Sequence, residues 1–301
     1  MILIKSNQLF LNRIPKNRIQ KFIYSPFSRI IIAILFLIPM LLVNNVITIF
    51  ILDKMEEVIV LSTLKAFKAI IIIGLLIYSY RFYTKRIEKR PAFEFNFERW
   101  HIDLGWGIVI GGGMVIIITA VLFVLGYYTI DYINSWNILI TRIFRYAQGS
   151  FIEELIFTVI IFRLLEEKLG TAISFLIVSL FFGGMHFIND NATIFTSLSI
   201  SVIQITLIAP FILTRRIWMG WAVHFSWNFF QAGVFGMNNS GMDQGGFISP
   251  IITGPHWLTG GAFGIEASWL GLIVNIVVGI SLLIYAIKFK QTIKFMNKRA
   301  N

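Results

Sequence analysis

Long apolar runs are the feature that most limits what this chain can fold into. A helix that crosses the hydrocarbon of a bilayer needs about 20 mostly apolar residues, and about eight stretches of the chain approach that length. They lie at approximately 30–52, 66–83, 104–128, 146–165, 171–187, 191–214, 217–236 and 267–287. With a mean hydropathy of +0.78, the chain is predicted to be an all-α, polytopic membrane helix bundle with about eight transmembrane helices.

The net charge of +11 fits this class of protein better than it fits a nucleic-acid-binding protein. Lys and Arg are gathered into short segments between the apolar runs instead of following one helix face, so we interpret them as topology signals and contacts with anionic lipids. We expect no nucleic-acid partner. The chain contains no cysteine, which excludes disulfides, thiolate nucleophiles and thiolate metal sites.

The positive-inside rule predicts the orientation. No acid interrupts the basic residues that precede the first run, which are Lys5, Arg13, Lys16, Arg18, Lys21 and Arg29. The next loop carries Asp53, Glu56 and Glu57, as expected outside, and the tail is basic again with Lys288, Lys290, Lys294, Lys298 and Arg299. We therefore predict a multi-pass protein of the cell membrane with both termini in the cytoplasm. Its richness in Ile, Asn and Lys is typical of AT-rich bacterial genomes.

The chain is predicted to form one membrane domain. Residues 1–29 are interpreted as a basic cytoplasmic segment, 30–287 as the transmembrane domain and 288–301 as a basic cytoplasmic tail. The loop at about 237–266 is rich in Gly, Asn and Ser, and a loop of that length is either a lid or binding loop or a flexible outer connection.

Two local patterns in the helices have competing interpretations. Gly107 and Gly111 form a GxxxG pattern, which indicates close helix packing inside the bundle or a dimer seam. Glu166, Glu167 and Lys168 follow the fourth run at its cytoplasmic end. We interpret that charged run as solvated.

Two adjacent carboxylates, Glu153 and Glu154, stand in the middle of the apolar stretch 151–157. Insertion of a carboxylate at the centre of a bilayer costs roughly 2.5–3.5 kcal/mol, so such acids usually line a cavity or a proton or substrate path. This pair is the first candidate for a functional site.

Two other runs carry polar residues at helical spacing. Phe182 and His186 lie four residues apart, and so do His224 and Asn228, which places each pair on one helix face. Each of these buried polar groups needs a partner, and all of them fall at mid-membrane or outer depth. We therefore predict that three helices contribute to one shared site.

This set of side chains suits the hydrolysis of an amide bond by activated water. Glu153 would be the general base, His186 would help to position the water, and His224 and Asn228 would donate hydrogen bonds to the developing oxyanion. A zinc ion held by Glu153, His186 and His224 is the alternative. It ranks second because the usual His-Glu-x-x-His helix is absent.

These three motifs, in this order, resemble the CAAX prenyl protease and bacteriocin-processing (CPBP, or Abi) family of intramembrane proteases. The family pattern is Glu-Glu-xxx-Arg, Phe-xxx-His and His-xxx-Asn, and the matching core covers roughly 146–235. The stretch 260–266, which ends at Glu266, also resembles bacterial members. The resemblance implies a helical membrane fold and a peptidase site within the bilayer, with the roles given above.

One position departs from the family pattern, because Thr158 stands where the first motif has Arg. In the family that Arg is expected to pair with the second Glu. Arg163 points to a different helix face, so Glu154 has no nearby cation. We expect Glu154 to be protonated or hydrogen-bonded to another helix.

Two functions from different classes follow. The first is an intramembrane endopeptidase acting on a peptide or membrane protein; the resemblance implies prenylated C-termini in eukaryotes, whereas peptide pheromones, bacteriocins or membrane proteins suit a bacterial chain. The second, favoured by Thr158, is an inactive membrane scaffold with a membrane-protein partner, providing bacteriocin immunity or regulating a sensor kinase or cell-wall enzyme. A proton-coupled transporter is disfavoured by the lack of an inverted repeat.

Overall fold

The computed structural model describes residues 4–11, 15–50, 52 and 58–295. Six of the charged residues used to predict the orientation lie outside the described residues: Arg13, Asp53, Glu56, Glu57, Lys298 and Arg299.

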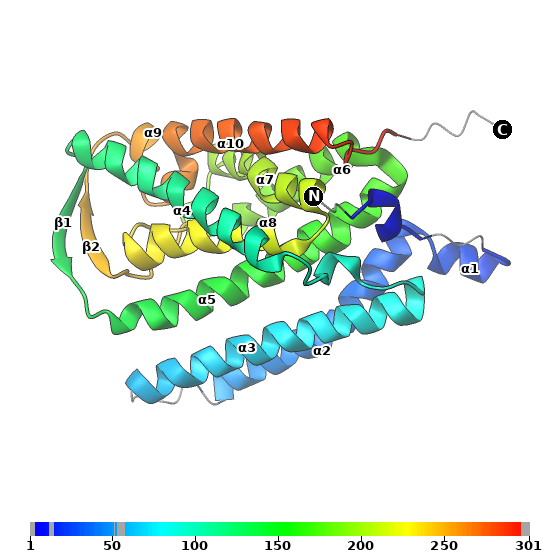
Figure 1. The fold of residues 1–301 in the computed structure, drawn as a ribbon. Coiled ribbons are helices and arrows are strands. Elements are labelled where there is room, and N and C mark those ends of the chain that lie inside the picture. The colour runs from blue at the N-terminus through cyan, green and yellow to red at the C-terminus, as the bar shows by residue number, and fades with distance from the viewer. Residues whose placement is uncertain (1–3, 12–14, 51, 53–57, 296–301) are drawn as a thin grey trace.

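The described residues form a helical bundle, as predicted (Figure 1). Its elements, in chain order, are η1 (Ser6–Leu9), α1 (Arg18–Ile23), α2 (Pro26–Phe50), α3 (Val58–Tyr83), η3 (Thr84–Glu88), η4 (Phe93–Phe95), α4 (Trp100–Val124), β1 (Tyr128–Ile133), α5 (Asn137–Glu153), η5 (Glu154–Phe162), α6 (Arg163–Met185), η6 (His186–Ile188), α7 (Ile194–Thr214), α8 (Ile217–Asn228), η7 (Phe229–Val234), β2 (Ile248–Ile252), α9 (His256–Thr259), η8 (Ile265–Ala267) and α10 (Trp269–Lys288).

Among these elements, 6 helical stretches are long and apolar enough to cross a membrane. The stretch Asn137–Ile188 contains two of the predicted spans. They are separated at Gly170, where the helix is interrupted and φ is 72° and ψ is 170°. That backbone conformation favours glycine. The predicted seventh span is divided between α8, which has 12 residues, and the π-helix η7, so neither part reaches the length of a spanning helix.

A two-stranded antiparallel sheet was not predicted. β1 pairs with β2 from Tyr128 opposite Ile252 to Ile133 opposite Ile248. The third predicted span therefore ends at Val124 instead of residue 128. The long loop after α8 carries β2, α9 and η8, so much of it is ordered against the bundle.

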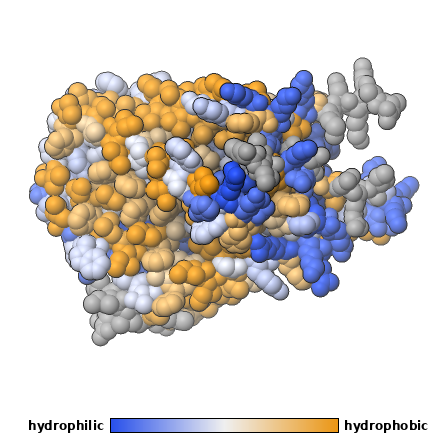
Figure 2. All heavy atoms as spheres, in the orientation of Figure 1, coloured by the Kyte–Doolittle hydropathy of each residue, from blue (hydrophilic) through white to orange (hydrophobic). Residues whose placement is uncertain are grey.

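Apolar side chains cover the outside of the helices, and polar ones gather at one end (Figure 2). Leu35 of α2, Val109 of α4 and Val277 of α10 are 56%, 62% and 60% exposed. Exposed apolar surface over several helices is what a lipid-facing surface requires. By contrast, α7 is mostly buried.

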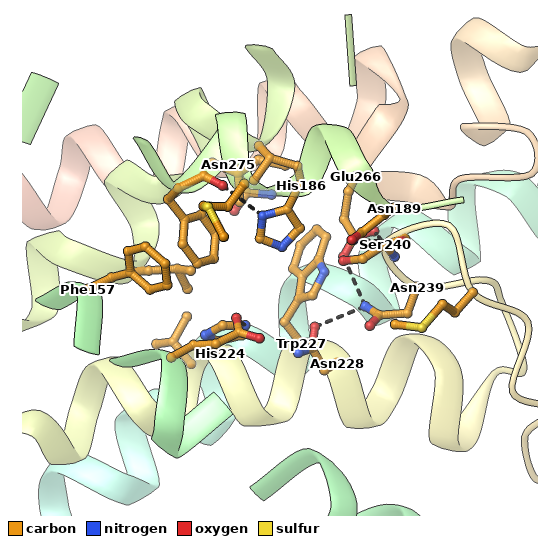
Figure 3. Close-up of a pocket in the computed structure, with 18 of the residues that line it drawn as sticks. Phe157, His186, Asn189, His224, Trp227, Asn228, Asn239, Ser240, Glu266 and Asn275 are labelled. Atoms are coloured by element: carbon orange, nitrogen blue, oxygen red, sulfur yellow. Dashed lines mark hydrogen bonds and ion pairs between the residues drawn. The ribbon is translucent and has the colours of Figure 1, made fainter. Parts of the chain in front are cut away.

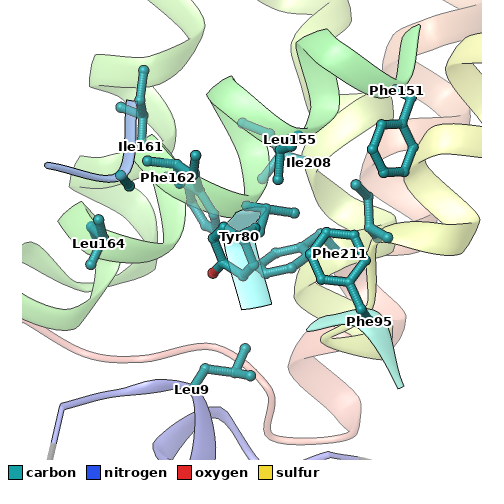
Figure 4. Close-up of a cluster of buried hydrophobic side chains, with 14 of the residues drawn as sticks. Leu9, Tyr80, Phe95, Phe151, Leu155, Ile161, Phe162, Leu164, Ile208 and Phe211 are labelled. Atoms are coloured by element: carbon teal, nitrogen blue, oxygen red, sulfur yellow. The ribbon is translucent and has the colours of Figure 1, made fainter. Parts of the chain in front are cut away.

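Aromatic packing fills the interior between α3, α5, α7 and the segment before α4 (Figure 4). The rings of Tyr80 and Phe95 meet edge to face at 5.3 Å, and those of Phe151 and Trp221 do so at the same separation. Such pairs add about 0.5–1.5 kcal/mol each beyond the area they bury. This core holds α5 against α8.

One residue of the charged run interpreted as solvated proves to be buried in an ion pair. Glu166 is fully buried, with its Oε1 3.2 Å from Nη2 of Arg215, so the prediction of a solvated charge run was wrong for this residue. Glu167 pairs with the buried Arg29 at 2.7 Å, and Arg216 binds Asp103 through two nitrogens. Charges buried in a bundle need such partners.

Gly107 and Gly111 bring α4 against α8 within the same chain. A Cβ atom on Gly107 would lie 2.5 Å from Cβ of Ala222, and one on Gly111 would lie 2.2 Å from the carbonyl oxygen of Val223. Ser226 also donates a hydrogen bond to the carbonyl oxygen of Gly107 at 3.2 Å. The GxxxG pattern therefore packs two helices of the bundle together and fixes the position of α8.

We predict that Gly111→Ala destabilises the folded protein, by about 1–3 kcal/mol, because the added methyl group meets backbone that cannot yield without separating α4 from α8. The matched control is Gly113→Ala on the same helix, where a Cβ meets nothing within 4 Å. Thermal unfolding in detergent measures both. Equal stability of the two variants would contradict the proposed role of this close contact.

Candidate active site

A cavity of about 370 Å³ lies between α5, α6, α7, α8 and the loop 237–266 (Figure 3). Four of the residues predicted to share a site line it: Glu153, His186, His224 and Asn228. They come from the end of α5, from η6 and from α8. Phe157, Phe182 and Trp227 supply apolar walls. A cavity of this kind, apolar with a few convergent polar groups, is the usual form of a binding or active site.

His224 lies between the two adjacent carboxylates. Its Nδ1 is 3.0 Å from Oε1 of Glu154, and its Nε2 is 3.6 Å from Oε2 of Glu153. The Glu153 side chain is 41% exposed, whereas that of Glu154 is only 3% exposed. The two acids therefore have different environments, and Glu153 is the one that faces the cavity.

The contact with Glu154 fixes how His224 can act. An ionised carboxylate only accepts hydrogen bonds, so it holds the proton on Nδ1 of the imidazole. Nε2 then faces Glu153 and the cavity. It accepts a hydrogen bond when the ring is neutral and donates one only when the ring is an imidazolium.

Glu154 does not line the cavity. Its Oε2 accepts a hydrogen bond from Oγ1 of Thr158 at 2.8 Å, and its Oε1 contacts His224 of another helix, as expected for this residue. Glu154 also begins η5, a nine-residue π-helix that the sequence did not reveal. Arg163 pairs instead with Glu88 at 2.9 Å and Glu94 at 3.1 Å.

His186 lies across the cavity from His224 (Figure 3). Its Nδ1 is 2.8 Å from the carbonyl oxygen of Phe182, and its ring packs on the Phe182 ring at 4.5 Å. The carbonyl accepts a hydrogen bond, so it assigns the proton to Nδ1. Nε2 is left as an acceptor for a ligand or water in the cavity.

Four residues of the loop 237–266 also line this cavity: Asn239, Ser240, Met242 and Glu266. Sequence reasoning assigned the loop no site residue, because the residues lie outside the three motifs. The loop therefore forms part of the cavity wall. Burial raises the pKa of Glu266 to about 7, even though hydrogen bonds from Ser240 lower it.

The arrangement does not favour the zinc alternative. Among the described residues, no three His, Cys, Asp or Glu side chains are grouped as ligands of one metal ion. Catalytic zinc takes three protein ligands. Glu153 and His224 are neighbours, but His186 does not complete a ligand set with them.

The fold and the cavity define a helical membrane protein with Glu, His and Asn side chains around a cavity between its helices. Comparison with protein families refines this class: residues 134–230 match the family model of Rce1-like type II CAAX prenyl endopeptidases. The match confirms the resemblance to the CAAX prenyl protease family over a stretch that contains all three motifs. No curated protein and no solved structure matches the chain.

We predict that Thr158→Val, which keeps the shape of the side chain but removes its hydroxyl, destabilises the protein by about 1–3 kcal/mol, because a buried oxygen of Glu154 loses its donor. Thr158→Ser keeps the hydroxyl and should retain most of the stability. Unfolding in detergent measures the difference. If Val and Ser variants unfold alike, Thr158 does not support Glu154 in this way.

Proposed function

We propose that this protein is an intramembrane endopeptidase that hydrolyses a peptide or a membrane protein close to the membrane. The observation that carries the proposal is the convergence of Glu153, His186, His224 and Asn228 on one cavity with apolar walls. The family match supports the same reaction class.

In the proposed reaction, Glu153 takes a proton from a water molecule in the cavity, and the water oxygen attacks the scissile carbonyl carbon. His186 holds that water through Nε2. The carbonyl oxygen gains negative charge, which Asn228 stabilises by donating from Nδ2 and which His224 stabilises when its Nε2 carries a proton. The proton held by Glu153 then passes to the departing amine nitrogen.

Glu154 has a different part in this proposal. It lies behind His224, where it orients the imidazole ring and balances its charge, and it does not touch the substrate. The Thr158 hydroxyl then replaces the family arginine as a neutral hydrogen-bond donor to Glu154. The departure from the motif is thus compatible with an intact site.

We further propose a cell-membrane location with both termini in the cytoplasm. The N-terminal and C-terminal segments meet at one end of the bundle, where Nε2 of Gln291 donates to the carbonyl oxygen of Ile4 at 3.2 Å. Basic residues gather at that end, in agreement with the positive-inside rule. The cavity would then open toward the outer half of the membrane.

The first test is cleavage of a library of membrane-proximal peptides, together with a farnesylated CAAX peptide, by detergent-purified protein. Wild type should cleave at least one peptide. Glu153→Gln and His186→Ala should each lower kcat to background, because the base or the water-holding group is lost. The matched control is Glu98→Gln, which makes the same chemical change at an exposed residue outside the cavity.

Absence of cleavage by the wild type would overturn the endopeptidase proposal. Recovery of a stable membrane-protein partner that still binds Glu153→Gln would instead favour the non-catalytic scaffold. Wild type and Glu153→Gln, compared for cleavage and for partner binding, therefore distinguish the two functions.

Metal dependence is tested with the same peptides. We predict that dialysis against a chelator leaves kcat unchanged, because Glu153, His186 and His224 form no three-ligand set. Metal content of the purified protein is measured in parallel. Loss of activity on dialysis and its recovery on addition of zinc would contradict the metal-free mechanism.

A further inference from the structure

Two side chains outside the three motifs approach Asn228 from the loop 237–266. Asn239 follows η7, and Glu266 lies in η8. Both are buried, at 5% and 4% exposure. Buried polar groups that lie outside the motifs in the sequence need an explanation.

The amide of Asn239 bridges Glu266 and Asn228 (Figure 3). Its Nδ2 donates one hydrogen bond to Oε1 of Glu266 at 2.9 Å and another to Oδ1 of Asn228 at 3.0 Å. The second oxygen of Glu266 accepts from the backbone nitrogen of Ser240 at 2.8 Å. Both hydrogens of the Asn239 amide group are therefore used.

This bridge determines which end of the Asn228 carboxamide is available for catalysis. Because Oδ1 accepts from Asn239, Nδ2 is directed the other way, 3.4 Å from Oγ of Ser150. Ser150 lies one turn before Glu153, on the same face of α5. The donor end of Asn228 thus points toward α5, the helix that carries Glu153.

The orientation depends on an acceptor at the far end of the bridge. An ionised carboxylate accepts hydrogen bonds and donates none, so Glu266 requires the nitrogen of Asn239 to face it. A neutral group at position 266 can donate, which lets the Asn239 amide turn over and present its oxygen. Asn228 would then turn as well and present Oδ1, an acceptor, to the developing oxyanion.

We propose that Glu266, acting through Asn239, is a positioning residue that holds Asn228 with its amide donor toward the reacting carbonyl. This inference rests on the proposed endopeptidase function and extends it to a carboxylate beyond the motif region. Glu266 itself touches neither the substrate nor the water.

The protonation of Glu266 should then appear in the pH dependence of the reaction. Its pKa of about 7 means that the carboxylate form, and with it the productive orientation, is lost as the pH falls through about 7. The titratable groups around it are His224 of α8 and Tyr146 of α5, which interact with its charge, and Glu153 and His186, which line the same cavity.

The test compares wild type with Glu266→Gln on a peptide that the wild type cleaves. Above pH 8, the variant should show kcat lowered by about tenfold or more with KM nearly unchanged, because an oxyanion donor acts in the transition state and its complete removal costs about 10²–10³ in kcat. Below pH 7, the ratio of the two kcat values should shrink, because Glu266 of the wild type is then neutral too.

A double-mutant cycle separates positioning from a purely structural role. In the Asn228→Ala background, Glu266→Gln should change kcat less than about twofold, because the group through which it acts is gone. A residue that only stabilises the loop would cost the same factor in both backgrounds.

Asn239→Ala provides an independent variant in case Glu266→Gln does not fold. It should lower kcat in the same way and lose its effect in the Asn228→Ala background. The matched control is the neighbouring Asn238→Ala, whose side chain donates to the carbonyl oxygen of Ala262 outside the bridge; its kcat should stay at the wild-type value.

The outcomes separate the two proposals. Cleavage by Glu266→Gln with wild-type kcat and pH profile would overturn the positioning role and leave the endopeptidase function standing. Equal effects of Glu266→Gln with and without Asn228 would also overturn it. No cleavage by the wild type would overturn the endopeptidase function and the positioning role with it.

Discussion

No water is available in the hydrocarbon of a bilayer, so each buried polar group of this protein must find its partner inside the bundle. That constraint governs two regions of the molecule. At the basic end, Arg215 and Arg216 are neutralised by Glu166 and Asp103. At the cavity, His224 is held between Glu153 and Glu154. The same requirement that makes such residues costly in a membrane therefore fixes how the helices are placed.

The position of α8 links these two regions. Gly107 and Gly111 let it approach α4 to backbone contact on one side, and the contact between His224 and Glu154 fixes it to η5 on the other. The helix carries four of the cavity residues, Val223, His224, Trp227 and Asn228, so a small rotation would withdraw them together. Close packing and a buried polar contact together give the site its geometry, as preorganised sites require.

The two adjacent acids are suited to different roles because they differ in burial. Adjacent residues on a helix point about 100° apart, and of the two acids only Glu153 lines the cavity. The exposed acid is suited to exchange protons with water. The buried acid is suited to hold an imidazole in one tautomer, and a threonine hydroxyl is sufficient to satisfy its second oxygen.

The sequence by itself determined the helical membrane class, because long apolar runs have few other stable outcomes. From spacing in apolar helices it also predicted that Glu153, His186, His224 and Asn228 lie together, and all four line one cavity. It did not reveal that Glu166 is buried, that Gly107 and Gly111 face α8, or that Asn239 and Glu266 reach Asn228. Those are contacts between residues far apart in the chain, and helical periodicity describes only neighbours within about one or two turns. Only the tertiary structure decided which polar group meets which, because that depends on how the helices are placed against one another.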